Sequence, residues 1–201
     1  MREVARWAVP GFLLAGPLHL FLDRLHAAPS WPLWLVAAPV LGFAIQQAVR
    51  SRFEAGEQGY RSPRRAALAE IIARGNLEQR RDCGDIAYQV YEVVFYQRPD
   101  WRAARDHEHR ARDSHFLCWS AAAASAAGAA LSLLGFGAHP GLATLYFVGL
   151  APAAVMLRRK GQQTLDALEL FDRALVATNW SDFDAVLRAI TARQTGSAAA
   201  G

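Results

Sequence analysis

The sequence has few of the residues that mark a disulfide-stabilised or zinc-binding protein. Its 201 residues include only two cysteines, Cys83 and Cys118, and neither belongs to a CxxC pair. That spacing excludes zinc-finger and thioredoxin-type motifs. Both cysteines fall in or beside a region that we place in the cytoplasm, where thiols stay reduced. We therefore expect two free thiols.

Lysine is also nearly absent, since Lys160 is the single lysine among 22 basic residues. The net charge of +4 would by itself fit a protein that binds nucleic acid. However, the arginines avoid two short loops and gather between and after apolar segments, as the positive-inside rule describes for membrane proteins. This rule accounts for the charge, and we expect no nucleic-acid partner.

Apolar segments of membrane-spanning length are present, although the mean hydropathy of +0.05 averages them against a charged middle. A helix needs about 20 residues to cross a bilayer core of about 30 Å. The stretches that approach this length are residues 7–22, 31–49, 116–136 and 141–157. The first resembles a signal peptide, but no small-x-small cleavage pattern follows it, so we expect a retained membrane helix.

The loops and their basic residues predict the topology. Short connections at residues 23–30 and 137–140 make two antiparallel hairpins. Residues 50–112 contain 13 arginines and residues 158–201 contain six basic residues, whereas Arg24 is the single basic residue in the hairpin loops. Because basic loops stay in the cytoplasm, we expect a multi-pass protein of the bacterial inner (plasma) membrane with both termini cytoplasmic.

The predicted fold is therefore all-α, with four transmembrane helices in two hairpins and a cytoplasmic helical bundle. Five regions follow along the chain. They are a transmembrane hairpin at 1–49, an arginine-rich cytoplasmic helical region at 50–115, a second transmembrane hairpin at 116–157, cytoplasmic C-terminal helices at 158–194, and a disordered tail at 195–201.

Start and stop signals divide the cytoplasmic part into helices. Ser62 caps a helix that Gly75 is placed to end, Asn76 is predicted to cap a second helix, and Asp100 a third that runs into the membrane segment 116–136. In the tail we predict a helix at 164–176 and another capped by Ser181.

We expect these cytoplasmic helices to pack together through apolar side chains. The residues are Leu68, Ile71, Ile72, Val90, Val93, Leu168 and Phe171. Ile72, Val90 and Phe171 are also candidates for a subunit interface. Arg64, in contrast, is expected to contribute little, as most exposed charges do.

A polar group at the outer end of the first hairpin is the main candidate site. His19, Asp23 and His26 are spaced i, i+4, i+7, which aligns them on one helix face, and His139 lies in the other outer loop. Ionisable residues at membrane depth are costly and usually functional. The group could ligate a metal or relay protons, or it could be an ordinary helix end that faces lipid headgroups.

A second candidate metal site lies at the inner side, where His109 and Asp113 are one helical turn apart and would need a third ligand. The competing interpretation is that this segment forms solvated i,i+4 ion pairs, such as Glu108 with Arg112. No motif identifies a cofactor, and zinc at either site is the one candidate that the residue types offer.

Two further patterns concern packing and chemistry. Asp85, Gln89 and Glu92 form a polar stripe, either a solvated face or a carboxylate pair for acid–base work. Residues 120–132 are nearly all small, with Ser125 and Gly128 among them, which favours close helix packing at the centre of the bundle or at an oligomer interface.

No motif identifies a reaction or a family. We therefore hold three hypotheses. The leading one is a non-catalytic membrane protein that lies in the lipid bilayer and acts by self-association or as a partner in a membrane complex. The alternatives are an oligomeric ion or proton channel or transport component, whose support is an analogy of topology, and a metal-dependent membrane enzyme.

Overall fold

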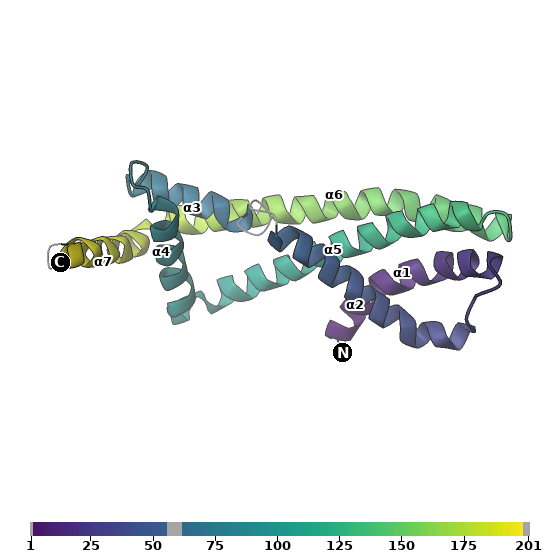
Figure 1. The fold of residues 1–201 in the computed structure, drawn as a ribbon. Helices are drawn as coiled ribbons and strands as arrows, with labels where there is room; N and C mark the ends of the chain where they lie inside the picture. The colour runs from purple at the N-terminus through teal and green to yellow at the C-terminus, as the bar shows by residue number, and fades with distance from the viewer. Residues whose placement is uncertain (1, 56–61, 199–201) are drawn as a thin grey trace. The chain divides into compact units, whose positions relative to one another are not determined.

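The computed structural model of the chain describes residues 2–55 and 62–198 (Figure 1). Within these ranges every regular element is a helix, so the predicted all-α class is confirmed. The elements are α1 (Arg2–Arg24), α2 (Trp31–Ala55), α3 (Ser62–Arg74), α4 (Cys83–Gln97), the 3-10 helix η1 (Pro99–Trp101), α5 (Arg102–Gly135), α6 (Pro140–Thr178) and α7 (Trp180–Ala198).

Three stretches are long and apolar enough to cross a membrane, which supports a membrane protein. They are Trp31–Arg52 in α2, Pro99–Gly135 in η1 and α5, and Pro140–Thr178 in α6. Within the residues that the structure describes, helix α1 is not among them. Its charged ends leave residues 7–22 as the apolar part, which is shorter than the about 20 residues that a full crossing needs.

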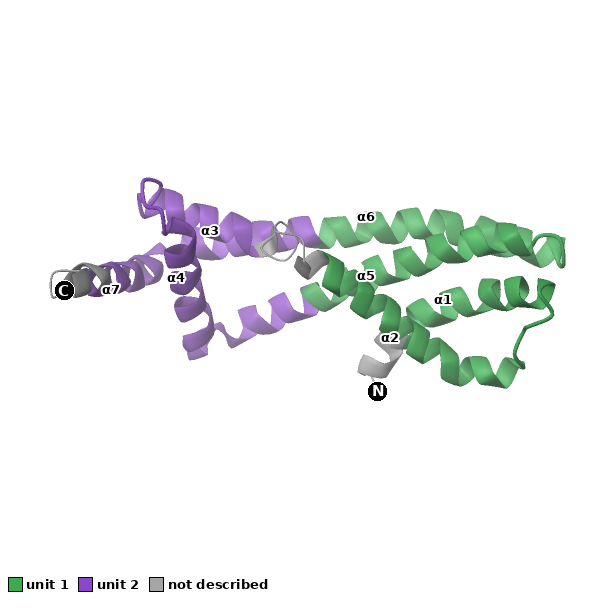
Figure 2. Cartoon of the chain, in the orientation of Figure 1, with its two compact units in different colours: residues 1–56, 112–164 green, residues 57–111, 165–201 purple. Residues whose placement is uncertain are grey.

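The chain divides into two compact units (Figure 2). Unit 1 consists of residues 1–56 and 112–164, and unit 2 of residues 57–111 and 165–201. Helices α5 and α6 each contribute to both units without a break. The prediction that the third cytoplasmic helix continues into the membrane segment is therefore confirmed.

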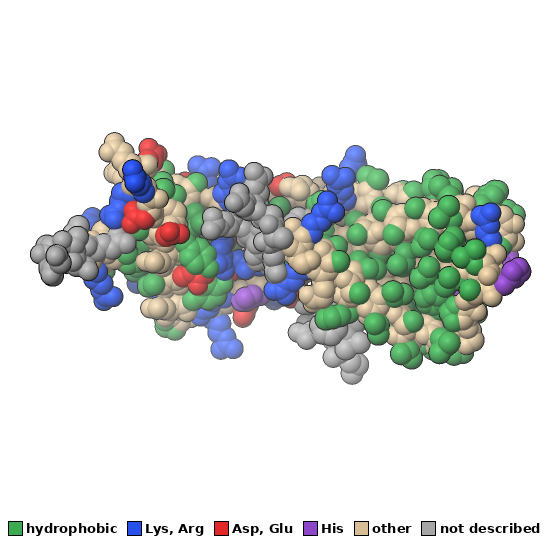
Figure 3. Space-filling view, viewed as in Figure 1, with side chains coloured by type: hydrophobic (Ala, Val, Ile, Leu, Met, Phe, Trp, Pro, Cys, Tyr) green, Lys and Arg blue, Asp and Glu red, His purple; other side chains and the backbone are tan. Residues whose placement is uncertain are grey.

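The surface of unit 1 is rich in large apolar side chains, as the space-filling view shows on the face toward the viewer (Figure 3). The exposed residues on α2 and α6 include Leu35, Val36, Val40, Leu145, Val148 and Met156. Soluble proteins rarely expose contiguous apolar surface of this kind. Such an apolar surface is typical of helices that contact lipid.

Inside unit 1 the helices approach closely at small residues. A Cβ atom on Gly11 of α1 would overlap the carbonyl oxygen of Ala38 of α2. On α5, Ser125 is fully buried, and a Cβ on Gly128 would lie 2.8 Å from Cδ1 of Leu150 of α6. This face of α5 is thus occupied by contacts within unit 1.

Unit 2 has a core of aromatic and aliphatic side chains from α3, α4, η1 and α7. Ile71, Val90, Tyr91, Phe95 and Phe183 are almost completely buried, and the rings of Tyr91 and Phe95 stack with centroids 5.2 Å apart. Of the residues predicted to pack here, Ile71 and Val90 lie in the core and Leu68 and Ile72 pack at its edge. Leu168 is also buried, and the ring of Phe171 lies 4.9 Å from that of His107.

The end of α3 differs from the prediction. Asn76 adopts a left-handed conformation with φ of 51°, and the amide of Leu77 donates to the carbonyl of Ile72 at 3.0 Å. This is the hydrogen bond of a Schellman C-terminal motif. Asn76 therefore ends α3 where we expected it to begin the next helix, and α4 starts only at Cys83.

The later boundaries also differ in detail. Asp100 lies within η1, and the helix predicted at 164–176 is the end of the continuous α6. Helix α7 begins at Trp180, one residue before the predicted cap Ser181. Of the tail predicted to be disordered, residues 195–198 belong to α7, and residues 199–201 lie outside the described residues.

Candidate functional site

The outer polar residues of unit 1 are found in two separate contacts. Asp23, at the end of α1, and His139, just before α6, make a side-chain hydrogen bond, in which Oδ2 of Asp23 lies 2.8 Å from Nε2 of His139. Both side chains are about half exposed. Arg24, beside Asp23, donates to the carbonyl of Leu134 near the end of α5. These contacts connect the end of α1 with the loop that joins α5 to α6.

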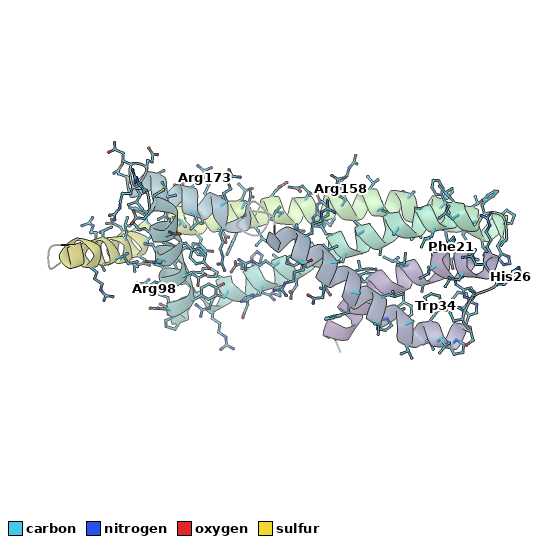
Figure 4. All side chains as sticks on the ribbon, viewed as in Figure 1. Phe21, His26, Trp34, Arg98, Arg158 and Arg173 are labelled. Carbon is cyan, nitrogen blue, oxygen red and sulfur yellow. The ribbon has the colours of Figure 1, made fainter. Side chains whose placement is uncertain are left out.

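His19 belongs to an aromatic environment instead. Its Nδ1 accepts a hydrogen bond of 3.1 Å from the indole nitrogen of Trp34, and its ring centroid lies 4.3 Å from that of Trp31. Because Nδ1 accepts, the neutral ring carries its proton on Nε2. His26 follows the end of α1 with φ of 53°, so the helical alignment ends before it. Figure 4 labels His26 and Trp34.

The positions of these histidine and aspartate residues test the hypothesis that the protein binds a metal ion. A catalytic zinc takes three protein ligands and a structural one four, but within the described part of the chain no group of three His, Cys, Asp or Glu side chains is arranged to hold a metal. His109 and Asp113, the inner candidates, are both exposed on α5. The structure thus brings together Asp23 and His139 from the predicted outer group, without a third ligand.

A more concentrated polar site lies in unit 2, around Arg64 of α3. Its Nη1 donates to the Oε1 of Glu92 at 2.7 Å and to the hydroxyl of Tyr88 at 3.3 Å, and its Nη2 donates to the hydroxyl of Tyr96 at 2.7 Å. Its Nε lies 3.9 Å from Oε1 of Glu108 on α5. We call these five residues the Arg64 cluster.

Geometry and burial hold the guanidinium of Arg64 in place. Its Cζ lies 5.6–5.8 Å from the ring centroids of Tyr88, Tyr91 and Tyr96, within the range of cation–π attraction. The Arg64 side chain is only 13% exposed, and that of Glu108 is fully buried. Burial lowers the pKa of Arg64, but the neighbouring Tyr96 and Glu92 outweigh this effect and the pKa is raised. Arg64 is therefore a fixed positive charge.

The Arg64 cluster corrects two sequence interpretations. Arg64 was expected to be an exposed charge of little consequence, whereas it is mostly buried and contacts two other helices. Glu108 was expected in a solvated ion pair, but it is fully buried. A signal for the cluster does exist in the sequence, because Tyr88, Glu92 and Tyr96 are spaced i, i+4, i+8 and so share one face of α4.

Part of the Arg64 cluster remains accessible. The residues Tyr88 and Tyr96 are 43% and 36% exposed, although Arg64 binds their hydroxyls. Nearby, Nη1 of Arg105 donates to the carbonyls of Phe95 at 2.8 Å and Arg98 at 2.7 Å. These bonds satisfy carbonyls at the end of α4 that have no partner within the helix. The result is a surface on which two exposed tyrosines lie beside a mostly buried arginine.

No protein-family model matches this chain, and neither a curated protein nor a solved structure matches it.

Proposed function

We propose that this chain is a non-catalytic protein of the bacterial inner membrane that acts by self-association or as a subunit of a membrane complex. Unit 1 is the membrane anchor in this proposal, and unit 2 is a binding module held in the cytoplasm. Helices α5 and α6 each contribute residues to both units. No catalytic step is assigned to either unit.

The proposed topology includes four spans, with α1 as the fourth. Two observations support α1. First, α1 packs closely against α2, because Gly11 has no side chain to separate its backbone from that of Ala38. Second, the C-terminal end of α1 contacts His139 and Leu134 near the loop between α5 and α6. Because α1 ends at the same level as the loop between α5 and α6, it would cross the same bilayer as these helices. The distribution of basic residues supports cytoplasmic termini.

The observation that carries the association function is the exposed part of the Arg64 cluster. Tyrosine and arginine are enriched among the residues that dominate protein–protein binding energy. Large side chains whose conformation is already fixed lose less entropy on binding. Tyr88 and Tyr96 meet both conditions, because each is exposed and each has its hydroxyl held by Arg64. We therefore assign the partner-binding surface to this side of α4.

Site-specific photo-crosslinking of the full chain in intact cells tests the assignment. A photoreactive residue at position 88 should form a discrete crosslinked species, which differently tagged copies of the chain would identify as self-association or as a different partner. Ala189 on the exposed side of α7 provides the matched control. Absence of a crosslink at 88, or equal crosslinking at both positions, would contradict the proposal.

A further inference from the structure

A groove opens in unit 1 between α2, α5 and α6, at the ends of their apolar segments. Its volume is about 740 Å³, within the range of about 300–1,000 Å³ that is usual for small-molecule pockets. Small and apolar side chains make up most of its walls. They are Val49 from α2, Ala122, Ala123 and Ala126 from α5, and Ala154 and Val155 from α6.

The polar residues of the groove are basic and aromatic. Arg52 of α2 and Arg158 of α6 both line it, and both are exposed. The Cζ of Arg158 lies 5.7 Å from the ring centroid of Trp119, which also lines the groove. Among the described lining residues there is no aspartate or glutamate. Figure 4 labels Arg158 on α6.

We propose that this groove binds one anionic phospholipid. An acyl chain would lie along the alanine wall of α5, and the phosphate would bind the guanidinium groups of Arg52 and Arg158. Arginine matches phosphate oxygens with two parallel hydrogen bonds, and basic pockets between membrane helices are known to select anionic headgroups. Trp119 would lie at the headgroup level, where tryptophan is enriched.

The shape of the groove separates this site from ordinary lipid contact. Exposed apolar residues such as Leu35 and Val148 offer only apolar surface, which does not distinguish one lipid headgroup from another. In the groove, three alanines of α5 leave room that a larger side chain would fill. A phospholipid would therefore use both the two arginines and the apolar space beside the alanines. A free phosphate ion would use only the arginines. The site is independent of the partner-binding surface of unit 2.

Native mass spectrometry of the full chain released from detergent, with phosphatidylglycerol and phosphatidylcholine as probes, tests the proposal. We expect one phosphatidylglycerol per chain to be retained in preference to phosphatidylcholine. The double variant Arg52→Ala, Arg158→Ala should bind phosphatidylglycerol on the order of tenfold more weakly. Arg159→Ala is the matched control, because Arg159 is exposed but does not line the groove.

A second variant tests the acyl part of the site. Ala123→Leu would fill the groove while both arginines remain, and it should reduce phosphatidylglycerol retention although circular dichroism and the melting temperature stay as in the wild type. Equal retention of the two lipids by the wild type, or unchanged retention by the double arginine variant, would overturn the proposal. So would displacement of the lipid by an equal concentration of inorganic phosphate.

Discussion

At Gly11, helices α1 and α2 approach each other so closely that any Cβ atom would meet the backbone of Ala38. Backbone atoms cannot rotate away as a flexible side chain can, so Gly11→Ala must separate the two helices. Overpacking of this kind costs about 1–3 kcal/mol. We expect a lower melting temperature of the detergent-solubilised protein, measured by circular dichroism.

The control for this prediction is Gly149→Ala in α6. No heavy atom lies within 4 Å of the Cβ that this change adds, and alanine is the better helix former. The melting temperature of Gly149→Ala should be equal to or slightly above that of the wild type. If the two variants melted alike, the close approach of α1 and α2 would not contribute to stability.

The ionisation of Glu70 should make the stability of unit 2 depend on pH. Its carboxylate accepts hydrogen bonds from Nε of Arg74 at 2.6 Å and Nε of Arg173 at 3.1 Å. The bond from Arg74, with a smaller contribution from Arg173, lowers the pKa of Glu70 below its usual value. The folded state therefore favours the ionised carboxylate. Its contribution to stability is complete above the unfolded-state pKa of about 4.3 and is lost as the pH falls through the lower folded-state value.

Denaturation midpoints measured between about pH 6 and about pH 3 check this pH dependence. The wild type should lose stability over the acid part of this range, and Glu70→Gln should lose less of it, because the amide cannot be protonated there. Glu78→Gln, which removes an exposed carboxylate, should follow the wild type. Identical acid dependence in Glu70→Gln and the wild type would show that the two arginine contacts do not form in solution.

At the scale of elements, the Arg64 cluster joins α3, α4 and α5 within unit 2. Arg64→Ala would remove the cation that lies 3.9 Å from the fully buried carboxylate of Glu108. Breaking a buried ion pair by removing one partner typically costs about 3–5 kcal/mol. We expect Arg64→Ala to reduce the free energy of unfolding by about 3 kcal/mol, as measured by chemical denaturation in detergent with tryptophan fluorescence.

A double-mutant cycle makes the origin of that loss testable. Adding Glu108→Gln to Arg64→Ala removes the buried negative charge, so Glu108→Gln should change the free energy of unfolding by a different amount in the Arg64→Ala background than in the wild type. Arg188→Ala serves as the control, since Arg188 is 80% exposed and exposed pairs contribute about 0–1 kcal/mol. Additive effects of Arg64→Ala and Glu108→Gln would mean that the two charges do not interact.

The sequence was sufficient to predict most of the helices, but it did not predict all of the residues at which they begin and end. Apolar length and the Ser62 cap predicted helices where the structure has them. The sequence Gly75-Asn76 offered two residues that can both end a helix, and only the hydrogen bond from Leu77 to Ile72 shows that Asn76 takes the left-handed position. Gly161 does not interrupt α6, where its missing side chain leaves room for the Trp119 ring.

The Arg64 cluster was not predicted because its contacts join residues far apart in the chain. Local spacing rules assign Glu108 to Arg112, one turn away on the same helix. Whether Glu108 also approaches Arg64 depends on how α3, α4 and α5 are packed within unit 2, and no i,i+4 pattern contains that information. The outer residues show the same limit, since Asp23 meets His139 while His19 meets Trp34.

At the scale of the whole molecule, the proposed topology makes a prediction about access from the two sides of the membrane. Residues 2–6, 50–112 and 158–193 contain 21 of the 22 basic residues, and Arg24 is the remaining one. Moving so many arginines across a bilayer is costly, so the side with these residues should remain cytoplasmic. The hairpin loops should then face the periplasm.

Cysteine labelling in intact cells measures this topology directly. In a variant with Cys83 and Cys118 replaced by serine, a membrane-impermeant thiol reagent should label Ala138→Cys, which is exposed in the loop between α5 and α6. It should not label Ala189→Cys on α7 until the cells are permeabilised. Because both positions are exposed in the structure, a difference in labelling reports the side of the membrane and not burial. Labelling of Ala189→Cys in intact cells would place unit 2 outside the cytoplasm, and the basic residues would then need partners other than the inner surface of the membrane.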